Sequence, residues 1–194
     1  MPLSIIFKSV NIINALISHA QPKGGKEKIL DEVKLFDGYP VGLQTRAVRE
    51  YCETLEFRPG QPILIKEDHT REICIVISGR AVAKISPELN LTFEAGDFFG
   101  ELSFIDAEPR SIRVLADKDS DKPTVIALLS RVALATISKK DQKLAMAILN
   151  NLLKCMAMKV REGNKVVQGI SREHQLAIAS ETPGFWDRLT IMFR

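Results

Sequence analysis

Short apolar runs separated by turn residues fill the middle of the chain, between residues 56 and 129. Polar turns such as Arg58-Pro59-Gly60 and Ser78-Gly79 interrupt them. The run at 73–77 is continuously apolar, whereas the run at 80–85 alternates polar and apolar residues. The other runs lie at 62–66, 91–93 and 124–129. Many short strands at this spacing predict a mainly β fold, an antiparallel barrel or sandwich.

Helical patterns precede the strands. Residues 1–27 predict an N-terminal amphipathic helix followed by a hinge at 21–26. Its polar face carries little positive charge, so packing on the domain or on a second copy is favoured over membrane association. Another helix is predicted over residues 42–55. Its apolar face consists of Leu43, Ala47, Val48 and Tyr51.

A longer helical pattern follows the strands. It starts after Ser138, has no Pro or Gly before Gly163, and predicts a long C-terminal helix over residues 141–168. This helix has more apolar surface than one face of a small barrel covers. Two interpretations stay open, a dimer seam and packing within the chain. The apolar positions are Leu144, Ile148, Leu149, Leu152, Met156 and Val160.

The last residues, 169–194, form a tail rich in large apolar side chains, and it holds the only tryptophan, Trp186. Docking on the core or on another chain is one interpretation of this tail. Recognition of a partner protein is the other, because aromatic residues are typical interface anchors. The chain is thus expected to divide into four parts, residues 1–27, 28–140, 141–168 and 169–194.

Composition and charge narrow the possible functions. The 194 residues carry 27 Lys+Arg against 24 Asp+Glu, a net charge of +3, and 45% are hydrophobic. This near balance lacks the basic surface that nucleic-acid binding requires, so no nucleic-acid partner is expected. Cys52, Cys74 and Cys155 are widely spaced and the three histidines are scattered. These patterns argue against disulfides and a metal site and favour reduced thiols in a cytoplasmic protein.

The stretch from residue 96 to 114 combines residue types suited to a phosphate and a sugar. Gly100 allows the backbone to approach a ligand closely, and a short helix predicted after it would offer N–H groups to an anion. Arg110 supplies a planar fork for phosphate oxygens and Ser111 a hydroxyl donor. Glu101 can accept hydrogen bonds from a ribose hydroxyl. The alternative is that Glu101 and Arg110 simply pair with each other.

The order and spacing of this stretch resemble the phosphate-binding cassette of the cyclic nucleotide-binding domain family. That family includes the bacterial catabolite activator protein and the regulatory subunits of cyclic-nucleotide-dependent kinases. The matching segments are Phe99-Gly100-Glu101-Leu102-Ser103-Phe104 and Pro109-Arg110-Ser111-Ile112-Arg113-Val114, with smaller matches at 33–36, 57–60, 75–79 and 95–98. The resemblance covers residues 28–140. It implies a jelly-roll-like antiparallel β-barrel with a short cassette helix and flanking helices.

The resemblance also implies a ligand, cAMP or cGMP, with no further cofactor. Glu101 would accept a hydrogen bond from the ribose 2′-hydroxyl, and Arg110 would pair with the cyclic phosphate. Ser111 and the backbone N–H groups of Leu102 and Ser103 would contact phosphate oxygens. The complete predicted site is Gly100, Glu101, Leu102, Ser103, Arg110 and Ser111.

Several positions depart from the family pattern. Glu67-Asp68 stands where the family commonly has Gly before an acid, and Phe104 replaces an aliphatic residue. Ile112 and Arg113 replace smaller residues and could crowd the pocket or shift its nucleotide preference. In the family, a residue of the helix after the barrel caps the purine. The candidates here are Lys154, Met158 and Lys159.

Three functions are compatible with these features. The first is a cyclic-nucleotide sensor that relays a helix movement to a protein partner or a second copy. The second is an interaction scaffold that keeps the fold without binding a ligand. The third is a fragment of a catabolite-activator-type transcription regulator, because residues 170–194 are too few for a helix-turn-helix domain. No nucleophile with a base and no Walker-type loop is evident, so an enzyme is not expected.

Overall fold

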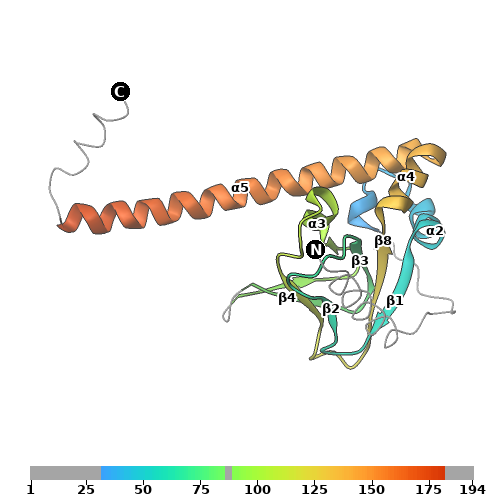
Figure 1. Ribbon diagram of the computed structural model, residues 1–194, viewed down its shortest axis with the longest axis horizontal. Coiled ribbons are helices and arrows are strands. Elements are labelled where there is room, and N and C mark those ends of the chain that lie inside the picture. The colour runs from blue at the N-terminus through green and yellow to red at the C-terminus, as the bar shows by residue number, and fades with distance from the viewer. Residues whose placement is uncertain (1–31, 86–88, 182–194) are drawn as a thin grey trace, which may run out of the picture. The chain divides into compact units, whose positions relative to one another are not determined.

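Two four-stranded antiparallel sheets form the centre of the first structural unit (Figure 1). The computed structural model describes residues 32–85 and 89–181. The strand orders are β1-β8-β3-β6 and β2-β7-β4-β5. The strands are β1 (Glu53–Phe57), β2 (Pro62–Leu64), β3 (Ile73–Ser78), β4 (Ala81–Lys84), β5 (Asn90–Phe93), β6 (Phe98–Phe99), β7 (Arg113–Ala116) and β8 (Thr124–Leu129). The predicted mainly β fold is confirmed.

The two most apolar strands, β3 and β8, occupy the middle of their sheet because both of their faces are buried. β8 pairs with β1 on one side and with β3 on the other. Side chains such as Val76 and Ile126 join the apolar cluster between the two sheets. Their neighbours Ile75 and Val125 join a second cluster, between this sheet and the helices. A continuous apolar run therefore predicts a central strand better than a run in which polar and apolar residues alternate.

Helices cover the outer face of the sheet that contains β3 and β8. The described helices are η1 (Lys34–Phe36), α2 (Val41–Tyr51), α3 (Glu101–Asp106), α4 (Arg131–Lys140) and α5 (Gln142–Glu181). α2 and α4 pack on each other, and the flanking helices expected from the sequence are thus present. No helix within the described ranges is long and apolar enough to cross a bilayer. The predicted N-terminal helix, within 1–27, and residues 182–194 of the predicted tail lie outside the described residues.

The helix predicted over 42–55 is wrong at its C-terminal end. α2 ends at Tyr51, Cys52 is extended, and β1 begins at Glu53. The apolar residues Leu55 and Phe57 recur at a spacing of two and point into the core between the sheets. Apolar residues at a spacing of two are typical of a strand, so the chain forms β1 here and does not continue the helix.

The single helix predicted over 141–168 is wrong at its end. The chain forms α4, breaks at Asp141, and restarts as α5, which continues through Gly163 and Gly169 to Glu181. An interior glycine costs a helix only about 1 kcal/mol, so these two residues do not end it. The boundary between two compact units lies inside α5, between residues 152 and 153. Five described elements, η1, β1, β6, β7 and α4, have no counterpart among the predicted elements.

Two buried amides hold the turn around η1 against the helices. Gln44 is 1% exposed, and its side chain accepts from the Val33 N–H (2.7 Å) and donates to the Tyr39 carbonyl (3.0 Å). Asn151 of α5 donates to the Asp37 carbonyl (2.8 Å). Buried polar groups are retained where they satisfy backbone groups in this way. The start of the domain is therefore attached to both α2 and the first turns of α5.

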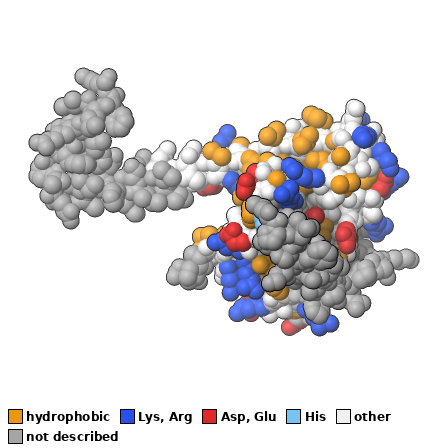
Figure 2. All heavy atoms as spheres, viewed as in Figure 1, with side chains coloured by type: hydrophobic (Ala, Val, Ile, Leu, Met, Phe, Trp, Pro, Cys, Tyr) orange, Lys and Arg blue, Asp and Glu red, His pale blue; other side chains and the backbone are white. Residues whose placement is uncertain are grey.

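Apolar side chains are also exposed on the helices. Figure 2 shows hydrophobic side chains among Lys and Arg side chains on one face of the molecule. Val132 of α4 and Met146 and Leu149 of α5 are exposed by 77%, 56% and 44%. Contact of these helices with another protein chain stays a prediction, because exposed apolar residues are common singly on protein surfaces.

A hydrogen bond from Tyr39 to Asp141 links the turn after η1 to the α4–α5 junction, with Oη and Oδ2 2.5 Å apart. This bond raises the pKa of Tyr39 from 10.0 to about 12 and lowers the pKa of Asp141 from 3.8. The unfolded chain then binds more protons below pH 3.8 and fewer above pH 10.0 than the folded chain. Stability contributed by this pair is therefore lost as the pH falls below 3.8 or rises from 10.0 towards about 12.

We expect Tyr39→Phe to lower the free energy of unfolding near neutral pH by about 1 kcal/mol, the usual value of one hydrogen bond. The difference between wild type and variant should shrink at both pH extremes, because the bond is lost there in the wild type too. Urea denaturation across the pH range measures this difference. A difference that stays constant with pH would contradict the assignment.

Candidate functional site

Gly100 lies at a turn where the backbone, Arg110 and β3 come very close together. β6 pairs with β3, with Phe99 opposite Cys74, and this pairing brings Gly100 next to Glu72. The φ of Gly100 is +84°. A Cβ there would lie 2.7 Å from Arg110 Nη1 and 3.2 Å from the Glu72 carbonyl oxygen. Glycine is therefore required both by conformation and by space.

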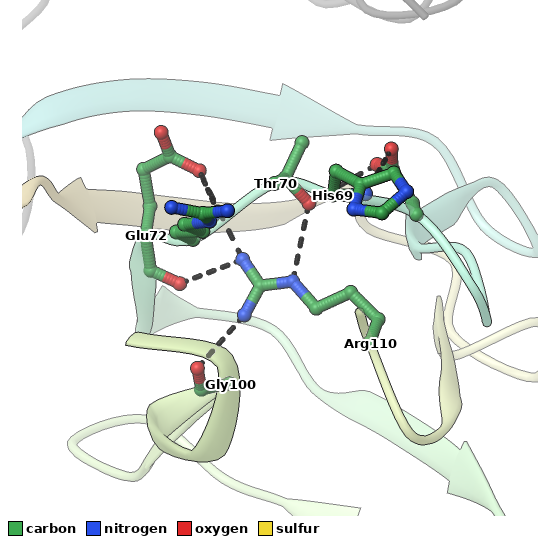
Figure 3. A network of polar contacts seen from close by, with 7 residues as sticks. His69, Thr70, Glu72, Gly100 and Arg110 are labelled. Carbon is green, nitrogen blue, oxygen red and sulfur yellow. Dashed lines mark hydrogen bonds and ion pairs between the residues drawn. The ribbon is translucent and has the colours of Figure 1, made fainter. Parts of the chain in front are cut away.

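Arg110 is buried, with 2% exposure, and its guanidinium is held from three sides (Figure 3). Nη1 donates to the Gly100 carbonyl (2.8 Å), Nη2 to the Glu72 carbonyl (2.8 Å) and Nε to Thr70 Oγ1 (3.1 Å). The Glu72 carboxylate lies 3.8 Å from Nη2 and forms the ion pair. A buried cation requires such partners, and these fix the orientation of its planar fork.

The backbone of Arg110 is also fixed, by the turn between β2 and β3. The Glu67 N–H donates to the Arg110 carbonyl and the Arg110 N–H donates to the Asp68 carbonyl, both at 2.8 Å. Glu67 has a φ of +66°, a conformation that costs a residue other than glycine about 1–2 kcal/mol. The predicted departure from the family pattern at Glu67-Asp68 therefore lies in the turn that holds Arg110.

The remaining predicted site residues lie next to this arginine in the chain or at the start of α3. Glu101 and Ser103 are each 3% exposed, whereas Leu102 is 39% exposed. Ser111 is exposed and directly follows Arg110. The structure thus brings Gly100 into contact with Arg110 and places the first residues of α3 immediately after Gly100. The three candidates for capping the purine lie on α5, and that role stays a prediction.

Ile112 and Arg113, the two residues that are larger than the family pattern has at these positions, lie in different surroundings. Arg113 pairs with Lys84 and is exposed, while the next residue, Val114, is fully buried between the sheets. Since side chains alternate along a strand, Arg113 points away from the interior and does not crowd it. Ile112 is partly buried and packs against the cluster between the sheets. Of the two, only Ile112 is positioned to narrow a pocket.

Thr70 and Glu72 are functional candidates that the sequence interpretation misses. Both hold Arg110, yet they lie far from it in the chain. The polar turn before β3 is visible in the sequence, but the pairing of β3 with β6 is a tertiary property. Within residues 32–85 and 89–181, no three His, Cys, Asp or Glu side chains gather in a way that could hold a metal ion.

The segment that contains this site resembles known proteins. Residues 54–141 match the family model of the cyclic nucleotide-binding domain. A stretch of 93 residues is 31% identical to the cAMP-dependent protein kinase regulatory subunit of Hypocrea atroviridis, covering 48% of this chain and 20% of that protein. A stretch of 108 residues is 27% identical to the cGMP-dependent protein kinase of Plasmodium berghei, covering 56% and 12%.

The fold is shared with solved structures. A cyclic nucleotide-binding domain from Methylobacillus flagellatus is 26% identical with a TM-score of 0.55, covering 73% of this chain and 79% of that one. The chain spans a fifth or less of the length of the two kinase proteins it matches. The comparison therefore concerns one domain of those proteins and not their whole activity. Residues 54–141 of this chain belong to the cyclic nucleotide-binding domain family.

Proposed function

We propose that the protein is a cytoplasmic, non-catalytic sensor that binds cAMP or cGMP and passes a helix movement to a protein partner or a second copy. The observation that carries the proposal is the buried Arg110 guanidinium, held in a fixed orientation beside Gly100 and the start of α3. A fixed fork of this kind suits a phosphate better than a mobile cation does. The family membership supports the same ligand class.

In this proposal the cyclic phosphate binds to Arg110, to the backbone N–H groups of Leu102 and Ser103, and to Ser111. The first N–H groups of a helix have no partner within the helix and carry partial positive charge, which favours an anion there. The Glu101 carboxylate accepts a hydrogen bond from the ribose 2′-hydroxyl. In this proposal the negative phosphate lies against the positive Arg110, and the neutral ribose lies against the Glu101 carboxylate.

Contacts between α3 and α4 offer a route for the signal. Arg131, the first residue of α4, donates from Nη2 to the Ile105 carbonyl of α3 (3.0 Å). Its guanidinium also lies 5.9 Å from the centre of the Phe104 ring, a cation–π distance. A ligand that draws in α3 would therefore displace α4, which leads directly into α5. The ligand can favour the displaced position of α3 and α4 over their position without ligand only by as much as it binds the displaced arrangement more tightly.

A ligand-free scaffold is a second candidate function, and one observation favours it. The guanidinium of Arg110 already has backbone, hydroxyl and carboxylate partners within the chain. A domain that has lost its ligand could keep the arginine for this structural role alone. Binding measurements separate the two functions.

We expect cAMP or cGMP, but not 5′-AMP, to raise the melting temperature, since a ligand at 100 times its Kd stabilises the folded state by about 2.7 kcal/mol. Glu101→Gln should weaken binding about tenfold or more, because hydrogen bonds to charged groups contribute about 1.5–3 kcal/mol. Glu108→Gln, at an exposed position between α3 and Arg110, is the matched control. Equal melting shifts in the two variants would contradict the role of Glu101. The absence of a shift with either cyclic nucleotide would favour the scaffold.

A further inference from the structure

A cavity of about 550 Å³ lies beside Arg110, bordered by strands of both sheets and by the turn that precedes β3. Its walls include residues of β1, β2, β3 and β8. The apolar wall residues from these strands are Leu55, Phe57, Ile63, Leu64, Cys74 and Leu128. A volume and lining of this kind are typical of small-molecule sites in proteins.

The cavity adjoins the predicted nucleotide site at Arg110, but the rest of its lining is different. Arg110 is the only one of the six predicted site residues that lines it. Figure 3 shows the Arg110 guanidinium between Gly100 on one side and Thr70 and Glu72 on the other. Thr70 and Glu72 line the cavity, and Gly100 does not. The guanidinium therefore stands between the cassette and the cavity.

Arg110 and the polar groups that contact it at the cavity already have partners. Thr70 Oγ1 accepts from Arg110 Nε and donates to the Asp68 carboxylate at 3.1 Å. Burial raises the pKa of Cys74 to about 12, so its thiol is neutral. Among the described residues, no buried side-chain nitrogen or oxygen lacks a hydrogen-bond partner. A charged ligand group placed against Arg110 would have to compete with these pairs, whereas a ligand that contacts the apolar wall residues would leave them intact.

We propose that this cavity binds a neutral, largely apolar small molecule, whose body contacts the wall residues of β1, β2, β3 and β8. Removal of apolar surface from water is then the main driving force, and the polar turn 68–72 forms the rim. The proposal does not depend on the proposed nucleotide function, because the apolar wall residues hold this ligand and the start of α3 does not. An occupant would nevertheless touch Thr70, Glu72 and Arg110.

N-phenyl-1-naphthylamine, a neutral probe whose fluorescence rises in apolar surroundings, tests the proposal by titration of the full chain. Leu128→Trp places an indole ring in the cavity and is expected to weaken probe binding about tenfold or more, because the ring occupies space and apolar surface that the probe needs. The matched control is Leu115→Trp. Leu115 is also partly buried on a strand, but its neighbours Val114 and Ala116 point inward, so it faces the other way. Equal probe affinity in both variants, or no binding to the wild type, would overturn the proposal.

Methyl NMR of the wild-type chain gives a second readout that does not require Leu128→Trp to fold. The probe should shift the methyl signals of Leu55, Ile63 and Leu128. Shifts confined to exposed methyls such as that of Met146 would overturn the site, because the probe would then lie on the surface. A cAMP titration without the probe completes the experiment. If cAMP fills the cavity and shifts the same three methyls directly, the cavity is the nucleotide site and the proposal of a separate ligand is wrong.

Discussion

Replacing Arg110 by lysine is expected to reduce the affinity for cAMP or cGMP at least about a hundredfold, while a folded domain is retained. A lysine keeps the charge but cannot present two parallel N–H donors to the phosphate. Loss of two charge-assisted hydrogen bonds, at about 1.5–3 kcal/mol each, accounts for this factor. Lysine also cannot reach the Gly100 carbonyl, the Glu72 carbonyl and the Thr70 hydroxyl at once, so a moderate loss of stability is expected as well.

Arg113→Lys is the matched control for this experiment. Arg113 lies three residues further along the cassette but is exposed on the outer face of β7, so its replacement should leave affinity and stability almost unchanged. Calorimetric titration reports the affinity and thermal unfolding reports the stability. Equal affinities for the nucleotide in Arg110→Lys and Arg113→Lys would rule out Arg110 as the phosphate ligand.

Gly100→Ala should destabilise the domain by roughly 2–4 kcal/mol and also weaken nucleotide binding. The left-handed conformation of this residue alone costs alanine about 1–2 kcal/mol. The added methyl group would also lie 2.7 Å from Arg110 Nη1, so the guanidinium must move. Its bond to the Gly100 carbonyl is then lost, which leaves a buried group without a partner at a cost of about 1–3 kcal/mol.

Gly42→Ala provides the comparison for this variant. Gly42 lies in α2, and a Cβ there would meet no atom within 4 Å. Alanine is a better helix former than glycine, so a gain of up to about 1 kcal/mol is expected. Urea denaturation of the two variants measures the contrast. Similar unfolding midpoints for Gly100→Ala and wild type would show that the close approach of Gly100 to Arg110 is not required.

The central strands and the cassette helix could be predicted from the sequence because local patterns determine them. The apolar run at 124–129 coincides with β8, and the run at 73–77 differs from β3 by one residue. Both faces of these two strands are buried, so almost every residue in them is apolar and the strands can be recognised in the sequence. The short helix after Gly100 was also accessible, since the glycine precedes a helix-compatible segment within the family-like motif.

The partners of Arg110 could not be predicted in the same way. Thr70 and Glu72 lie about forty residues before the arginine. The pairing of β3 with β6 and the backbone bonds of Arg110 to Glu67 and Asp68 bring them together. The end of α2 depends likewise on the core, because Leu55 and Phe57 are buried between the sheets. Local periodicity therefore predicts elements, whereas the surroundings of a buried charge depend on tertiary contacts.

The proposed function requires that this chain binds a cyclic nucleotide through Arg110. Isothermal titration calorimetry of the full chain with cAMP, and separately with cGMP, measures this binding. We expect saturable heat with one nucleotide bound per chain for at least one of the two, and loss of that heat in Arg110→Lys but not in Arg113→Lys. A folded wild-type chain that gives no binding heat and no change in melting temperature with either nucleotide would show that it is not a cyclic-nucleotide sensor.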